Sequence, residues 1–133
     1  METGNMYNDN KVLFASDGRE LIVNHLYTIE DYFTFDIKVK SGEFTGASNF
    51  CMPKEKVIFM VESLSKMLQT LEGYCEVKDY DTDANVVLEM EKLGHMCIYG
   101  QLGGSHEEHS MKFKYTADQT VAANLMKMLK ALL

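Results

Sequence analysis

The sequence has few of the residues that bind nucleic acid. Its 133 residues include a single arginine, Arg19, and carry a formal net charge of -7 with a pI near 5.0. Proteins that bind nucleic acid usually present a basic patch, and arginine is the residue best suited to hold a phosphate with two hydrogen bonds. The composition therefore argues against nucleic acid as a direct ligand. An acidic chain instead favours a basic partner, or simply solubility.

Cysteine is also scarce, and targeting signals are missing. Cys51, Cys75 and Cys97 are odd in number and widely spaced, and no CxxC pair occurs, so the pattern favours free thiols over a zinc site. The first residues lack the basic and apolar regions of a signal peptide. No apolar run approaches the length of a bilayer. We expect a cytoplasmic protein with no membrane partner.

Length and composition suit a single folded unit. A chain of 133 residues with 46% hydrophobic residues can bury one core. The first ten residues are polar, and we expect them to form a frayed or disordered N-terminus. The remaining residues, 11–133, are predicted to form one domain.

Alternating apolar residues predict most of the strands. From residue 32 to residue 40, Phe33, Phe35 and Ile37 alternate with polar residues, which is typical of a strand with one buried face. Asp17-Gly18 is a two-residue hairpin signal, and Gly46 is read as a possible β-bulge. The predicted strands span residues 11–16, 19–27, 32–40, 43–52, 74–78, 85–91, 95–102 and 110–116.

Two segments carry the helical period. After Pro53, a residue that suits the first helical position, apolar residues recur every three or four positions, and Gly73 is placed to end this helix. Near the C-terminus, Thr116 and Gln119 form a capping-box pattern that predicts a last helix beginning one residue after Thr116. The element order predicts an α+β fold, with antiparallel strands in two groups, each followed by an amphipathic helix packed on the sheet.

Acidic residues are concentrated between Glu72 and Glu91. This segment holds seven carboxylates and one lysine, a net charge of −6 out of −7 for the chain. Such a segment can dock a basic protein and steer its approach, although solvated acidic faces are common. A later loop adds two histidines and two further acids. The candidate partner-binding residues are therefore Glu76, Asp79, Asp81, Asp83, Glu89, Glu91, His106, Glu107, Glu108 and His109.

The histidines do not form a standard metal site. His106 and His109 are three residues apart in a predicted loop, whereas the HExxH motif needs two histidines four apart on a helix. We therefore expect no metal and no cofactor. No GxSxG or phosphate-loop motif is present either, and we expect no enzymatic activity. The alternative left open is a small metal-binding module or metal-dependent enzyme that uses His95, His106 and His109.

The last third of the chain carries a family resemblance. It combines Gly94-His95 at the start of a strand, the loop Gly103-Gly104-Ser105-His106, an alternating strand over residues 111–115, and Asp118-Gln119-Thr120 before the last helix. In these features the chain resembles the WapI-type immunity proteins of bacterial polymorphic-toxin systems. The resemblance extends more loosely upstream to about Tyr32.

The resemblance implies a function that the composition alone does not give. It implies a cytoplasmic antitoxin that binds the toxic C-terminal domain of a secreted polymorphic toxin, for which we expect a nuclease. Neutralisation would then be occlusion, because acidic side chains would pair with the lysines and arginines that a nuclease uses for phosphates. A plainer alternative is an α+β domain that binds some other protein.

Overall fold

The computed structural model describes the backbone of residues 10–133 and the side chains of residues 12–133. It contains two four-stranded antiparallel sheets, each followed by one helix, which confirms the predicted α+β fold. The first half consists of β1 (Asn10–Ser16), β2 (Arg19–Ile29), β3 (Tyr32–Ser41), β4 (Phe44–Pro53) and α1 (Lys54–Thr70). The second half consists of β5 (Gly73–Lys78), β6 (Asn85–Met90), β7 (His95–Leu102), β8 (Met111–Asp118) and α2 (Thr120–Leu132).

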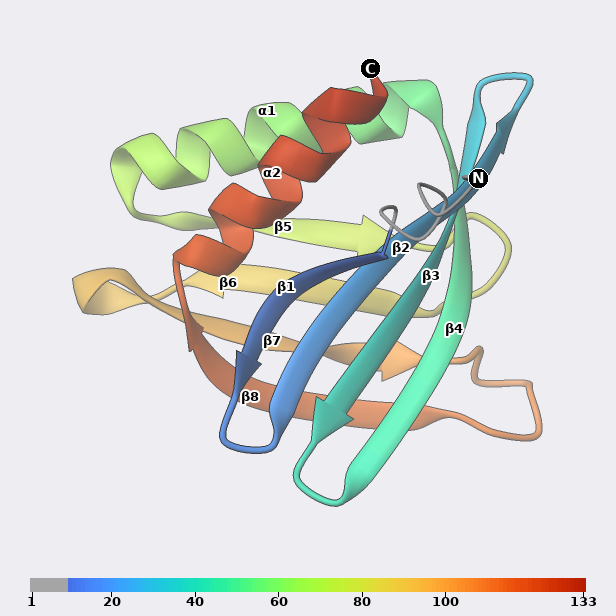
Figure 1. Ribbon diagram of the computed structural model, residues 1–133, viewed down its shortest axis with the longest axis horizontal. Coiled ribbons are helices and arrows are strands. Elements are labelled where there is room, and N and C mark those ends of the chain that lie inside the picture. The colour runs from blue at the N-terminus through green and yellow to red at the C-terminus, as the bar shows by residue number, and fades with distance from the viewer. Residues whose placement is uncertain (1–9) are drawn as a thin grey trace, which may run out of the picture.

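The two sheets face each other with crossing strands, and both helices lie at one side of them (Figure 1). Each sheet keeps its strands in sequence order. Helix α1 packs on β5 and on α2, while α2 packs on β1, the first strand of the other sheet. Hydrogen bonds also join the two halves: for example, the Tyr115 hydroxyl donates to the Glu20 carbonyl at 3.0 Å, and Asn124 Nδ2 donates to the Leu13 carbonyl at 3.2 Å. The two halves therefore share one core.

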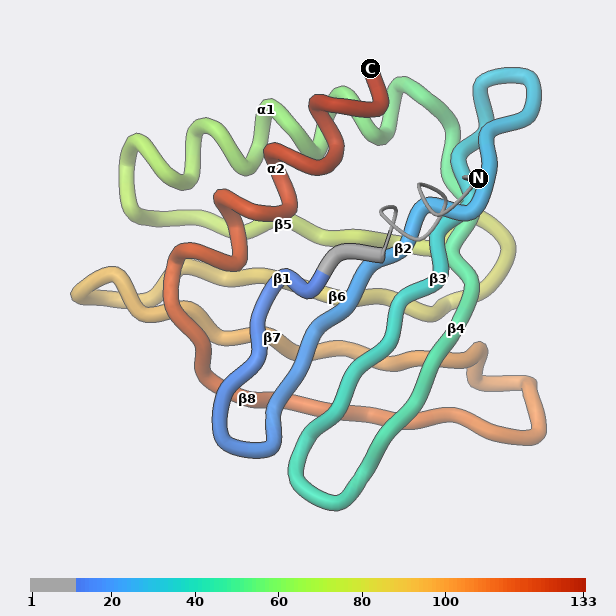
Figure 2. The backbone as a smooth tube through the Cα atoms, in the orientation of Figure 1, coloured from blue at the N-terminus to red at the C-terminus, as the bar shows by residue number. Residues whose placement is uncertain are grey.

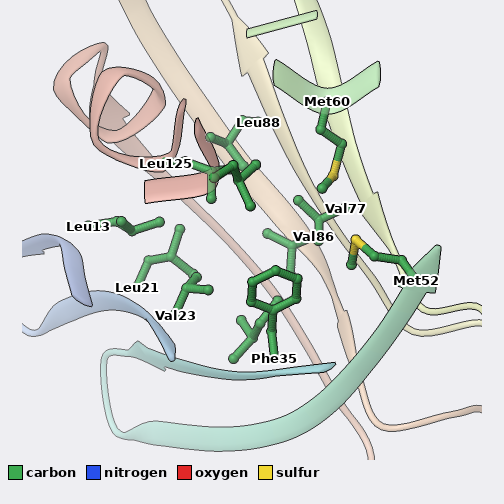
Figure 3. Close-up of a pocket in the computed structure, with 12 residues that line it drawn as sticks. Leu13, Leu21, Val23, Phe35, Met52, Met60, Val77, Val86, Leu88 and Leu125 are labelled. Carbon is green, nitrogen blue, oxygen red and sulfur yellow. The ribbon is translucent and has the colours of Figure 1, made fainter. Parts of the chain in front are cut away.

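The alternation predicted for β3 is confirmed. Phe33, Phe35, Ile37 and Val39 are all buried against the second sheet. Between the sheets lies a small apolar void of about 20 Å³ (Figure 3). Its walls are aliphatic, aromatic and methionine side chains, so nothing there would hold a water molecule by hydrogen bonds. The void is a packing defect, since it is too small for an organic ligand.

The expected N-terminal tail largely lies outside the described residues. Residues 1–9 are not described. Asn10 was expected to belong to the tail, but it lies in β1 and pairs with Asn24 of β2. Among residues 10–133, neither helix has the length and apolar character needed to cross a bilayer.

The bulge predicted at Gly46 is wrong. The pairing of β3 with β4 is continuous, and the irregularities lie between Val12 and Phe14 and between His25 and Tyr27. Glycine suits position 46 because of close packing, since a Cβ there would lie 2.9 Å from the sulfur of Met111. The chain crosses β8 closely at this point.

The predicted ends of α1 also shift. Pro53 is the last residue of β4 and the N-cap of α1, so the first helical residue is Lys54. At the other end Leu71, not Gly73, adopts the left-handed conformation that stops the helix, with its N–H donating to the Met67 carbonyl at 2.8 Å. Gly73 begins β5.

The capping box predicted at Thr116 is wrong. Thr116 lies inside β8 opposite Cys97, and the strand continues to Asp118. The Asp118 carboxylate accepts hydrogen bonds from the Thr120 hydroxyl and, at 2.9 Å, from the Thr120 N–H. Asp118 therefore supplies the carboxylate that satisfies the start of α2.

This geometry predicts which cap residue matters. Asp118→Ala should lower the free energy of unfolding by about 1 kcal/mol, since it removes the acceptor of the Thr120 N–H and a typical hydrogen bond contributes about that much. Thr116→Ala, on the exposed side of β8, should change it by less than about 0.5 kcal/mol.

Hydrogen bonds from Thr120 hold the pKa of Asp118 below its usual value. The contribution of the Asp118 carboxylate to stability is therefore fully present above its pKa in the unfolded chain, and it is lost as the pH falls through its pKa in the folded protein. Urea denaturation of both variants at pH 7 and pH 3 would test this, and equal losses would contradict it.

Candidate functional site

Two loops meet at one end of the second sheet. The loop that joins β5 to β6 spans residues 79–84, and the loop that joins β7 to β8 spans residues 103–110. Figure 2 shows both at the same end of the molecule. Ser105 connects them, because its N–H donates to Asp83 Oδ1 at 2.8 Å and its hydroxyl donates to Asp83 Oδ2. We call these two segments the carboxylate loops.

The first carboxylate loop is fastened to the edge of β4. Asp79 Oδ1 accepts a hydrogen bond from the Cys51 N–H at 2.9 Å, and Oδ2 accepts one from the Thr82 hydroxyl at 2.7 Å. The Tyr80 N–H donates to the Cys51 carbonyl at 2.8 Å. Asp79 is only 5% exposed. Although it was a candidate contact residue, its carboxylate is used inside the molecule and is not available to a partner.

The other carboxylates of the loops are exposed, and two of them, Asp83 and Glu107, are held by hydrogen bonds. Hydrogen bonds from Ser105 keep the pKa of Asp83 below its usual value, so this carboxyl stays ionised. Glu107 Oε1 accepts a hydrogen bond from the Gly104 N–H at 3.0 Å. Asp81 and Glu108 point to solvent, and His109 Nε2 lies 3.4 Å from Glu108. The loops therefore present four carboxylates at one end of the fold.

The remaining candidate acids lie elsewhere. Glu76 and Glu89 are on the outer face of the second sheet, where they accept hydrogen bonds from Asn85 at 2.9 Å and from the Tyr99 hydroxyl at 3.0 Å. Glu91 follows β6 at the opposite end. The strand register places three lysines on that outer face as well: Lys78, Lys112 and Lys114. The net charge of −6 along the sequence is therefore divided over three places and is not one patch.

The three histidines of the metal alternative are not brought together. His95 begins β7, and the loop with His106 and His109 follows its far end. A strand of eight residues spans roughly 25 Å. Among the residues that the structure describes, no group of three or more histidines, cysteines or acids is arranged to hold a metal ion. The site proposed for His95, His106 and His109 is not formed.

An aromatic groove adjoins the carboxylate loops, and sequence reasoning missed it. It lies between the first turns of α1 and the 79–84 loop and has a volume of about 520 Å³. Phe59 and Tyr80 line it, and the Tyr80 ring lies edge-on to Tyr32, with centroids 5.9 Å apart at 62°. The exposures are 41% for Tyr32, 58% for Phe59 and 66% for Tyr80. The groove lining consists of Met52, Pro53, Glu55, Lys56, Phe59, Lys78, Asp79 and Tyr80.

Sequence comparison adds no relatives, and structural comparison adds a likeness of fold. No family model matches the chain, and no curated protein is detectably similar to it. Among solved structures, the crystal structures of MRP1/MRP2 from Trypanosoma brucei contain a chain with a TM-score of 0.54 and 12% sequence identity. The match covers 92% of this chain and 80% of that one. At this identity the likeness concerns the fold alone.

Proposed function

We propose that this chain is an immunity protein that binds the toxic C-terminal domain of a polymorphic toxin, expected to be a nuclease, and neutralises it by occlusion. Two features support the proposal. The first is the resemblance carried by Gly94-His95, the 103–106 loop and residues 118–120. The second is the pair of carboxylate loops, which the hydrogen bonds between Asp83 and Ser105 join at one end of the fold. The proposal places the protein in the cytoplasm, where it would meet a toxin domain that enters the cell.

The observation that carries the proposal is the joining of the two loops by Asp83 and Ser105, which gathers four exposed carboxylates at one end of the fold. Loops that are already ordered lose little conformational freedom when a partner binds. Carboxylates held at one end of the fold can pair with the lysines and arginines that a nuclease uses to hold phosphates. A bound immunity protein would then cover the surface that its partner needs for substrate. No chemical step on the immunity protein is required.

The choice of residues for a test follows from the hydrogen bonds. Asp79 and Asp83 hold the loops together, so replacing them would disturb structure as well as charge. Asp81 and Glu108 are exposed, and their replacement by Asn and Gln preserves shape. A matched control replaces Glu62 and Glu72, which are exposed on α1 and just after it, by Gln. Both double variants change the net charge from -7 to −5.

We expect the loop variant, Asp81→Asn with Glu108→Gln, to bind more slowly. Its association rate with the toxin domain encoded beside this gene should fall about tenfold at low salt, while the control variant stays within about twofold of wild type. The difference should shrink with salt, because the Debye length falls from about 10 Å at 0.1 M to about 3 Å at 1 M. Surface plasmon resonance across a salt series would measure both rates.

Two outcomes would count against the proposal. One is that co-expression of the wild-type chain fails to restore growth to bacteria that produce the neighbouring toxin domain. The other is that the loop variant and the control variant slow association equally. The second result would show that total charge matters and the carboxylate loops do not.

A further inference from the structure

The backbone of Tyr80 is fixed, but its side chain is left in solvent. Its N–H is bonded to the Cys51 carbonyl, and the preceding Asp79 is bonded to both Cys51 and Thr82. The ring nevertheless remains 66% exposed and touches Tyr32 only edge-on. Folding gains little from a ring held in this way, since most of its apolar surface is still in water. Tyrosine is one of the residues enriched among binding hot spots, so this ring is a candidate contact for a partner.

The groove beside Tyr80 has apolar walls at its centre. Phe59 lines the same groove as Tyr80, and so do Met52 and Pro53 at the end of β4. Phe59 is 58% exposed on a helix whose opposite face is buried, so it too adds little to the core. Side chains placed between two such rings lose water from both faces, which is how interface anchors gain their energy. The groove is therefore suited to an apolar side chain from another molecule.

Charge around the groove is distributed unevenly. Lys56 lies on the α1 wall with its Nζ 5.2 Å from the centre of the Phe59 ring, and Lys78 lies at the end of β5. Glu55 and the buried Asp79 line the groove as well, so the charges inside it are of both signs. Next to the groove, Asp81 follows Tyr80 and leads into the carboxylate loops, where carboxylates are in excess. A cation on the partner therefore fits best beside the groove, over the loops.

We infer that the aromatic groove binds an aromatic or large aliphatic side chain of a partner segment that carries a lysine or arginine in the adjacent position. The apolar side chain inserts between Phe59 and Tyr80, and the cation lies over Asp81 and the carboxylate loops. This inference deepens the proposed function, because it specifies which chemistry a toxin domain would present. Strands of nucleic acid and anionic lipids are poor occupants, since the loops would repel their phosphates.

Small peptides test the groove without any toxin. The probe is N-acetyl-Trp-Arg-amide, with N-acetyl-Trp-Glu-amide as its matched opposite in charge. Each is titrated at millimolar concentration into the ¹⁵N-labelled chain, and amide chemical shifts are followed by NMR. The largest shifts should fall on Phe59 and Tyr80. At low salt the Arg peptide should bind at least about threefold more tightly than the Glu peptide.

A control variant distinguishes specific binding in the groove from nonspecific binding to exposed tyrosines. Tyr80→Ser should weaken binding of the Arg peptide by about tenfold or more, as loss of an interface tyrosine does. Tyr74→Ser, which removes a tyrosine of 64% exposure at the opposite end of β5, should leave it unchanged. Phe59→Ser is the second groove variant if Tyr80→Ser does not fold. Absence of binding, shifts centred elsewhere, or equal affinity for the two peptides would overturn the inference.

Failure of the groove inference can be distinguished from failure of the proposed function. Protection from the toxin in cells together with no peptide binding would remove the groove and leave the immunity function standing. Binding of the Arg peptide in the groove without protection would leave the site and reject the toxin as its partner.

Discussion

Replacing Asp79 with alanine should lower the free energy of unfolding by about 3 kcal/mol, the largest effect we expect from any polar residue described above. The carboxylate is 5% exposed and accepts hydrogen bonds from the Cys51 N–H and the Thr82 hydroxyl. Without it, the Cys51 N–H at the edge of β4 would be left near the protein interior with no acceptor, and a buried unsatisfied donor is costly. Urea denaturation followed by circular dichroism would measure the loss.

A neighbouring aspartate provides the control for this prediction. Asp81→Ala removes the same kind of side chain two residues later, where it is exposed, and should change stability by less than about 0.5 kcal/mol. Equal losses for the two variants would mean that the Asp79 carboxylate does not support the loop. Because Asp79 also fixes the backbone of Tyr80, Asp79→Ala should weaken peptide binding in the groove as well.

Gly100→Ala should be at least as damaging. Gly100 lies in β7 opposite Val86 of β6, and a Cβ at this position would lie 2.1 Å from the Asn85 carbonyl oxygen and 3.0 Å from the Val86 Cα. Both are backbone atoms of a paired strand, so relief requires the two strands to separate locally. We expect a loss of about 3 kcal/mol or more, at the upper end of the usual cost of overpacking.

Gly46→Ala is the matched comparison. Its added Cβ would approach the sulfur of Met111 at 2.9 Å, but that atom belongs to a flexible side chain that can move. We expect a cost of about 1 kcal/mol, and thermal denaturation of both variants gives the order directly. A smaller loss for Gly100→Ala than for Gly46→Ala would contradict the prediction.

Strands could be predicted from the sequence because burial on one face leaves a period of two. Phe33, Phe35, Ile37 and Val39 are buried as the pattern requires, while Lys38 between them is exposed. The boundary at Thr116 could not be predicted in the same way. Its local pattern with Gln119 favours a helix start, but pairing with β7 continues through Ala117 to Asp118 and overrides the local preference. A stretch of a few residues does not show which distant strand it will pair with.

The candidate site could be predicted only in part. The sequence indicated the acids near residue 80 and the loop after residue 102 as candidate contacts for a partner, and hairpin geometry brings these two segments together through Asp83 and Ser105. Counting charges along the chain failed for Asp79, because burial and bonding to Cys51 depend on a strand some thirty positions earlier. Tyr80 was missed for a related reason, since exposure of an aromatic ring leaves no periodic signal.

The packing of α2 on β1 ties the two ends of the chain into one core. The last helix completes a core that the first strand begins, and Asn124 bonds to the Leu13 carbonyl. During synthesis the apolar side of β1 is therefore not covered until α2 has been made. A chain that stops short of α2 would expose that side to proteases and chaperones. The two ends of the chain therefore depend on each other, and loss of the last helix should affect the first strand as directly as loss of the strand itself.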